Sequence, residues 1–402
     1  MNAYLDLLRT RGVARLIAAQ LVARFPGGMI SLGLLIHIEG IFDSYGAAGI
    51  VLAATSVGQA ISGPVTSRWM GRWGMRPVLI LTTTVSALAL TVVALVDMPL
   101  WGFVAAGFTA GLSNPPVQPA VRTIYPKMVN SRQLTPLFSL DASAQEIIWI
   151  AGPVVVTFVA TQVSTVAGIF LSVVFLVVGG AWFIASPELG RVRIPRSKRR
   201  FGVVLARPPV LLATVVGFLL VGTCAAIEAS VVAEFGEGGA EAGLVLAIWS
   251  VASLAGGLAF GHVPIGPWAL ARRMLFVFVG AALAIFALGF WTTSAALVVS
   301  GLGIAPALAV MFSIVSASVK FSDTAEAYGW VGTGQLVGAA IGSAAAGFLI
   351  DGYGPVGGFV AASGIALLGV IVPVVFRRAH PDLRGRDASP LADTEPVALP
   401  PR

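Results

Sequence analysis

Charged side chains are scarce in this sequence. Asp, Glu, Lys and Arg make up 11% of its 402 residues, whereas a soluble globular domain carries roughly 25%. Hydrophobic residues make up 57%, and the mean hydropathy is +0.92. A core of ordinary size cannot hide so many apolar side chains from water, so much of the surface must face lipid. We therefore expect an integral membrane protein.

Cysteine and histidine are also scarce. The single cysteine, Cys224, excludes a disulfide within the chain and a thiol-rich metal site. With only three histidines, a His/Cys metal centre is not supported. The sequence contains no phosphate-cradling Walker loop, so ATP does not drive the protein directly. No local motif of a Ser-His-Asp or Cys-His set is present, and we expect no metal, no cofactor and no enzymatic activity.

Long apolar runs are what the sequence does contain. A transmembrane helix needs about 20 predominantly apolar residues. The runs predict an all-α integral membrane fold with twelve transmembrane helices; only "TTS" separates the ninth from the tenth, so eleven remains an alternative. The predicted spans are 13–38, 47–69, 77–97, 99–121, 138–161, 165–186, 209–233, 241–261, 274–293, 295–318, 327–350 and 355–376.

Basic residues are distributed unevenly among the predicted loops. With the N-terminus inside, 24 of the 25 Lys and Arg residues lie in cytoplasmic segments, and the exception is Arg24 in the first span. This bias is a strong topology signal. It predicts a multi-pass protein of the cell membrane with both termini in the cytoplasm. It also explains the pI of about 10.2, so nucleic-acid binding is not needed to account for the basic excess. The outer loops carry only the acidic residues Asp43, Asp97, Glu234, Glu237, Glu241 and Asp351.

The chain divides in the middle. The stretch "RVRIPRSKRR" (191–200) has six basic residues in ten, which suits a cytoplasmic linker attracted to anionic lipid headgroups. We predict two pseudo-symmetric six-helix bundles, at 1–186 and 209–376, joined by a basic linker at 187–208. The proline- and charge-rich tail at 377–402 is expected to be disordered.

The two halves resemble each other in sequence. "AGIVLAATSVGQAISG" (48–63) matches "AGLVLAIWSVASLAGG" (242–257) at Ala-Gly, Val-Leu-Ala, Ser-Val and the final Gly, with an offset of 194 residues. Both segments follow the first span of their half. Duplicated six-helix halves related by an axis along the membrane normal are a known transporter architecture, with substrate bound between them.

These features resemble the major facilitator superfamily, over residues 1 to about 380. The closest local match is the loop after the second span, where Gly63, Arg72, Gly74 and Arg76 fit the family pattern and Gly71 replaces its aspartate. The resemblance implies a cytoplasmic latch between the halves. The missing acid leaves open whether the latch works by a charge relay.

Arg68, Arg72 and Arg76 are spaced four residues apart, so on a helix they would share one face. Such a stripe can bind lipid phosphates or the C-terminal carbonyls of a helix in the other half. Alternatively, the arginines only fix the topology. We assign them, with Gly63 and Gly74, to a cytoplasmic gate.

The fifth predicted span contains two further family patterns. Gly152-Pro153 matches a dipeptide of antiporter members, although the surrounding glycines are absent. The spacing of Asp141, Gln145 and Glu146 is similar to that of bacterial efflux-type members. The fourth span lacks the arginine that many proton-coupled members have, so the motifs alone do not carry proton coupling.

Ionisable residues within spans are costly and mark functional sites. Arg24 lies roughly 16 Å and Glu146 roughly 12 Å from the cytoplasmic end of their spans, at 1.5 Å per residue. We predict that they pair, directly or through substrate or water, and that protonation of Glu146 frees Arg24. A permanent structural ion pair is the alternative. Glu228, near the outer end of the seventh span, is either a further proton-coupling group or an interfacial acid.

Uncharged polar residues within spans are candidates for substrate contact. Pro115, Pro116 and Pro119 should kink the fourth span, and broken backbone in a membrane usually lines a cavity. Hydrogen bonding between helices is the alternative role for each polar residue. The candidates are Gln59, Asn114, Gln118, Gln145, Trp149 and Gln335.

Gly334, Gly338 and Gly342 form a small-residue face on the eleventh span. Small residues at this spacing allow close approach of a second helix. Close static packing is our preferred interpretation, and sliding during transport is the alternative.

The sequence therefore predicts a secondary transporter that works by alternating access. We expect a monomer that exports a small organic solute, hydrophobic or amphipathic, in exchange for protons. A transport-inactive membrane scaffold or sensor on the same fold is the alternative. The expected partners are the solute, protons and membrane lipids, and no nucleic acid.

Overall fold

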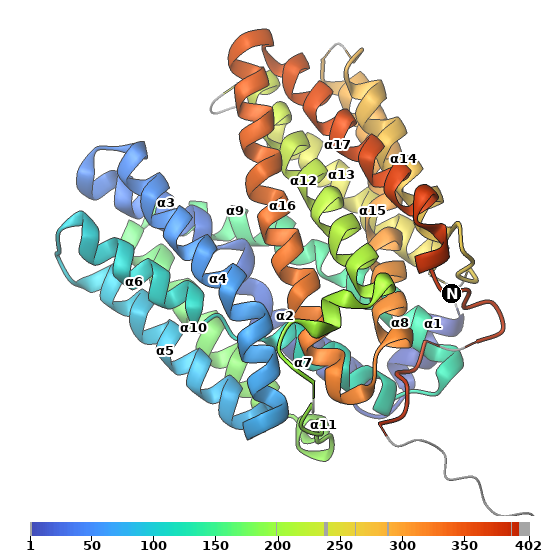
Figure 1. The fold of residues 1–402 in the computed structure, drawn as a ribbon. Helices are drawn as coiled ribbons and strands as arrows, with labels where there is room; N and C mark the ends of the chain where they lie inside the picture. Colours follow the sequence, from blue (N-terminus) through green and yellow to red (C-terminus); the bar gives the residue numbers. More distant parts are fainter. Residues whose placement is uncertain are drawn as a thin grey trace, which may run out of the picture.

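The computed structural model describes residues 2–197, 199–236, 240–261, 263–287, 289–386 and 388–393. Over these residues the chain is almost entirely helical, and the one extended pairing described is a single bridge between Lys320 and Leu391. The predicted all-α fold is confirmed. Figure 1 shows two groups of helices, one from each half of the chain, that meet at one end and diverge toward the other.

The helices of each half follow one another with short connections. The first half contains α1 (Asn2–Arg9), α2 (Val13–Arg24), α3 (Ile30–Phe42), α4 (Tyr45–Trp73), α5 (Met75–Leu95), α6 (Leu100–Leu112), α7 (Val117–Ile124), α8 (Ser131–Ala144), α9 (Glu146–Gln162) and α10 (Thr165–Ala185). The short α11 (Pro187–Arg191) follows. The second half contains α12 (Pro208–Phe235), α13 (Ala240–Phe260), α14 (Ala269–Ala284), α15 (Phe290–Ser318), α16 (Thr324–Tyr353) and α17 (Pro355–Val375).

Ten helical segments among the described residues are long and apolar enough to cross a membrane. The chain is therefore a multi-pass membrane protein. Two predicted spans are not among the ten: the fourth is divided between α6 and α7, and the ninth corresponds to α14, which has 16 residues. The total of twelve stays a prediction.

Three predicted spans of the first half are interrupted along their length. The predicted break of the fourth span is confirmed, since α6 ends at Leu112 and α7 begins only after Pro116. The first span is not continuous as predicted, because Pro26 and the two following glycines turn the chain through a short 3-10 helix, η1 (Phe25–Gly28). The fifth is interrupted at Gln145, between α8 and α9.

The two halves repeat the same helix pairings. In the first half α4 packs on α6 and α5 on α10; in the second, α13 packs on α15 and α14 on α17. The junction between the halves repeats as well. Ser139 Oγ donates to Gly257 O at 2.5 Å, and Thr333 Oγ1 donates to Ala60 O at 2.6 Å. Ser139 and Thr333 differ by 194 residues, which is the offset of the sequence repeat.

The small-residue face of α16 packs against α12 of the same half. A side chain at Gly338 would collide with the backbone of Phe218, and one at Gly342 with the backbone of Gly222. These glycines are required for the close approach of the two helices. The face lies within one half, as expected for static packing.

The tail differs from the expected disorder. Leu383 N donates to Ile265 O at 2.9 Å, and Leu391 N donates to Val319 O at 2.9 Å. Leu383 and Ala388 are buried. The overall polarity of the tail favours disorder, but these few apolar residues suffice to hold residues 377–386 and 388–393 against the second half. Residues 387 and 394–402, and Glu237 of the predicted outer loops, lie outside the described residues.

Candidate functional site

A cluster of polar side chains lies in the first half. It is formed by the ends of α2 and α8, next to two of the helix breaks, and by α7, the helix that follows the break in the fourth span. Gln20 and Arg24 come from the end of α2, Gln118 and Arg122 from α7, and Asp141 and Gln145 from the end of α8. Because the spans are interrupted here, side chains from three separate elements can meet at one place. We call these six residues, with Tyr125, the polar cluster.

Asp141 is the centre of the polar cluster and is fully buried. Its carboxylate accepts hydrogen bonds from Arg122 Nε at 3.0 Å, Gln20 Nε2 at 3.1 Å and Tyr125 Oη at 3.2 Å. It also forms an ion pair with Arg24 Nη1 at 3.4 Å. A buried carboxylate is stable only when its lone pairs are satisfied in this way.

Arg24 was predicted to pair with Glu146, and this direct pair is wrong. The guanidinium instead contacts Asp141 and donates to Gln20 Oε1 and Gln145 Oε1, both at 2.8 Å. Asp141 and Gln145 are four residues apart and share one face of α8, whereas successive residues on a helix differ by about 100° in direction. Glu146 therefore points elsewhere.

Arg122 was placed in a cytoplasmic loop by the topology argument, but it lies in α7 and is 2% exposed. Its guanidinium carbon lies 3.3 Å from the ring centroid of Phe312 in α15, a cation–π contact across the two halves. When the amide oxygen of Gln118 faces the arginines, it accepts from Arg122 at 2.7 Å and from Arg24 at 3.2 Å.

Glu146 joins the two halves. It is buried, and its Oε1 accepts from Ser253 Oγ in α13 at 2.9 Å. Ser253 Oγ in turn accepts from the backbone amide of Ala305 at 3.2 Å. Glu228, in α12, is exposed and near enough for its charge to act on Glu146. Two of the three predicted proton-coupling residues therefore lie in one region, with one carboxylate from each half.

The predicted substrate-contacting residues divide into two groups. Gln118 and Gln145 belong to the polar cluster. Asn114 and Trp149 are exposed, whereas Gln59 and Gln335 are half-buried, and the side chain of Gln335 lies against Gly217 of α12.

The predicted gate residue Arg68 connects three parts of the chain. It forms an ion pair with Glu326 at the first turn of α16 and donates to the backbone carbonyl of Arg199 in the linker. Glu326 also accepts from the backbone amide of Gly202 at 2.8 Å. Here an acid of the second half faces Arg68, although the loop itself lacks the family aspartate.

The other gate residues have separate positions. Gly63 packs against the backbone of Gly329 in α16, so it lies at the junction of the halves. Gly74 has φ of 93° and separates α4 from α5. This break ends the helix after Arg72, so the predicted continuous stripe is wrong. Arg72 is exposed, and Arg76 donates to Ser186 O at 3.4 Å within the first half.

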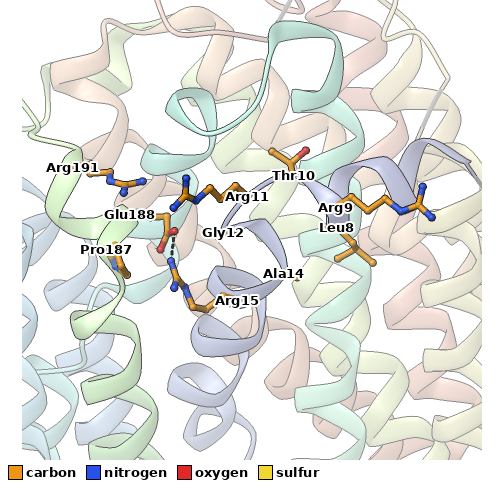
Figure 2. A pocket seen from close by; sticks show the side chains of 10 residues that line it. All are labelled: Leu8, Arg9, Thr10, Arg11, Gly12, Ala14, Arg15, Pro187, Glu188 and Arg191. Carbon is orange, nitrogen blue, oxygen red and sulfur yellow. Dashed lines mark hydrogen bonds and ion pairs between the residues drawn. The ribbon is translucent and has the colours of Figure 1, made fainter.

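A cavity of about 400 Å³ lies at the linker end, between the turn that joins α1 to α2 and the helix α11. Figure 2 shows the Glu188 carboxylate bonded to Arg15, with Arg11 and Arg191 directed toward the same place. The Arg15–Glu188 distance is 2.5 Å. Its lining adds Arg9 at the edge, so this cavity is basic and separate from the polar cluster.

Sequence reasoning missed Gln20, Arg122, Asp141 and Glu326 as functional candidates. Asp141 was available through its spacing to Gln145, and Arg122 through its spacing of four residues to Gln118. Asp141 was named only for its family-like spacing, and Arg122 was counted only as a cytoplasmic basic residue. Glu326 gives no local signal, because its partner is 258 residues away.

A model of the Major Facilitator Superfamily matches residues 16–294 and 223–399. The chain belongs to this superfamily. The match covers nearly the whole chain, and it confirms the resemblance drawn from the loop after the second span. Among curated proteins, none matches this sequence.

Solved structures of the superfamily share the fold. A bacterial homologue of the iron transporter ferroportin, in an outward-facing state, aligns with TM-score 0.72 at 15% identity, covering 91% of this chain and 99% of its own. The human organic anion transporter MFSD10 gives 0.71 at 16%, covering 90% and 99%. The E. coli fucose:proton symporter FucP gives 0.70 at 15%, covering 92% and 98%. At these identities the likeness shows the fold alone.

Proposed function

We propose that this superfamily member is a secondary active transporter that exports a small organic solute across the cell membrane in exchange for protons. The observation that carries the proposal is the pairing of groups across the two halves: Glu146, at the start of α9, with Ser253 of α13, and Arg68 with Glu326 at the linker end. Contacts of this kind can form in one arrangement of the halves and break in the other, which is what alternating access requires.

Glu146 and Glu228 are the proposed proton carriers. Protonation removes the negative charge from a buried carboxylate, and it also removes the repulsion between Glu146 and Glu228. Both changes favour closer approach of the first and second halves. Arg24 contributes through Asp141 and Gln145, since Gln145 immediately precedes Glu146 in the chain.

The solute site is proposed at the polar cluster. Gln118 and Gln145 contribute amide groups there. The exposed Asn114 lies in the break before α7, and the exposed Trp149 lies one helical turn after Gln145. Gln59 and Gln335 extend the proposed site to α4 and α16. Broken helices at such a site are typical of transporters, because unwound backbone can be satisfied by a wet cavity.

Membrane lipids are the proposed partners of the linker end, which we place in the cytoplasm. Arg9, Arg11, Arg15 and Arg191 surround the cavity of Figure 2, and Glu188 offsets part of their charge. Clustered arginines at a cytoplasmic membrane face attract anionic headgroups. We propose a monomer, because one chain contains both halves of the junction.

The test is transport in proteoliposomes. Purified protein is reconstituted, a proton gradient of either direction is imposed, and solute flux and internal pH are recorded together. Solute moving against the proton flow supports exchange, and solute moving with it would replace export by co-transport. If a broad solute collection produces no coupled flux, the alternative of a transport-inactive scaffold or sensor is favoured.

A further inference from the structure

The polar cluster has an unequal count of charges. It contains two guanidinium groups, Arg24 and Arg122, and one carboxylate, Asp141. Among the described contacts of Arg24, the one acidic partner is Asp141. Glu146 is directed to Ser253 of the other half instead. The cluster therefore holds one positive charge that its own members do not neutralise.

Amide oxygens satisfy the hydrogen bonds of this excess charge without cancelling it. Gln20 and Gln145 each accept from Arg24, and Gln118 accepts from both arginines in its favourable orientation. An amide is a dipole with no net charge, so it replaces water at the guanidinium but leaves the charge uncompensated. Removing such a charge from water is costly unless an anion accompanies it.

Access distinguishes the three charged groups. The side chains of Asp141 and Arg122 are 0% and 3% exposed, whereas that of Arg24 is 13% exposed. Arg24 is therefore the most accessible of the three charged groups, and the other two hold it in place. Nη1 and Nη2 of Arg24 already donate to Gln20, Asp141 and Gln145, so a ligand carboxylate would displace amide oxygens to reach two parallel N–H groups of this guanidinium.

The excess charge is confined to one half. At the offset of 194 residues, the positions equivalent to Arg24, Arg122 and Asp141 are Phe218, Ser316 and Gln335. These three positions of the second half therefore carry no charge, and the carboxylate that α12 contributes, Glu228, lies ten residues beyond Phe218. A solute bound between the halves would meet a cation on one side only.

We propose that the polar cluster binds the carboxylate of an organic monoanion through Arg24, and that an apolar body of the solute faces the second half. This inference rests on the proposed transport function and names its substrate class. The exposed ring of Trp149, one helical turn beyond Gln145, lies on the same side of the fifth span. A cation would be repelled by Arg24, and a neutral solute would leave the excess charge uncompensated.

The test compares solutes that differ only in charge. The full-length protein in detergent is heated with 4-tert-butylbenzoate, 4-tert-butylbenzamide or 4-tert-butylbenzylammonium, and with the same three groups on phenyl and naphthyl bodies. Unfolding is followed by tryptophan fluorescence. Ligands that bind the folded state raise its Tm. We expect at least one benzoate-type monoanion to raise Tm. Its amide and ammonium counterparts should need at least a tenfold higher concentration to give the same shift in Tm.

Two variants locate the binding. In Arg24→Gln the monoanion shift should disappear. Gln145→Glu keeps the shape and the bond to Arg24 but adds the missing negative charge, so it should fold and still lose monoanion binding. The matched control is Arg132→Gln, which removes an exposed arginine from the same helix as Asp141 and should retain the full shift.

Several outcomes would overturn the inference. These are a series in which no monoanion raises Tm, equal shifts from amide or ammonium counterparts, or a full monoanion shift in Gln145→Glu. Because the assay needs no gradient, it separates this inference from the proposed function. Proton-coupled flux of a neutral solute with no monoanion binding would refute the substrate class alone, and monoanion binding without flux would refute transport alone.

Discussion

Arg68 and Glu326 hold the halves together at the linker end, and their removal should open that end. Arg68 is 25% and Glu326 4% exposed, so the pair is neither a surface pair nor a fully buried one. Exposed pairs contribute roughly 0.2–1 kcal/mol, and loss of one member of a buried pair costs about 3–5 kcal/mol. Glu326 keeps its bond to Gly202 N in Arg68→Gln, which lowers the cost. We therefore expect Arg68→Gln to destabilise the closed linker end by about 1–3 kcal/mol, which corresponds to a 5- to 150-fold change in the population of the open arrangement.

The assay reports the open fraction directly. Ser139 is buried at the junction, where its hydroxyl bonds to Gly257 O. Ser139→Cys, in a Cys224→Ser background, can react with N-ethylmaleimide only when the junction opens. When opening is fast, the alkylation rate is proportional to the open fraction. We expect Arg68→Gln to raise this rate about 5- to 150-fold.

The matched control is Arg72→Gln. It removes the same charge one helical turn later, from an exposed side chain. The rate should remain within about twofold of the parent, because exposed charges contribute little. A rate change below twofold in Arg68→Gln, or an equal increase in Arg72→Gln, would refute the assignment of Arg68 as a latch.

Three further variants test other contacts in the described residues. Glu146→Gln should retain solute binding but lose proton-driven flux in proteoliposomes. The control is Ser253→Ala, which keeps the carboxylate. Full proton-driven flux in Glu146→Gln would count against the coupling role. Asp141→Asn should lower stability by about 3–5 kcal/mol, because it leaves two buried guanidinium groups without a counter-charge; thermal unfolding measures this, and an unchanged Tm would contradict the described network. Gly338→Val should destabilise the protein by at least about 1–3 kcal/mol by forcing α16 from α12; wild-type stability in this variant would show that the helices are not in close contact.

Hydropathy and the charge of the loops made the membrane fold predictable from the sequence. The bilayer requires long apolar helices and penalises basic residues outside the cytoplasm, so both signals are spread over the whole chain and survive local errors. The repeat at 194 residues was also visible. It reappears in the structure as the contacts of Ser139 and Thr333.

The candidate site was only partly predictable. Arg24, Gln118 and Gln145 were identified because polar groups inside a span are conspicuous. Their partner Asp141 was not chosen, and Glu146 was chosen in its place. The error came from using depth alone, because two residues at similar depth can point in different directions.

The sequence by itself determined that this chain crosses a membrane many times, in two related halves joined by a basic segment. This information is carried by composition and period, which need no knowledge of contacts. Only the tertiary structure decided which charges meet, because Arg68 and Glu326 are 258 residues apart and Arg24 and Asp141 are 117 apart. The partners of a buried charge depend on where helices break and which faces they turn inward, and these are properties of the packed bundle.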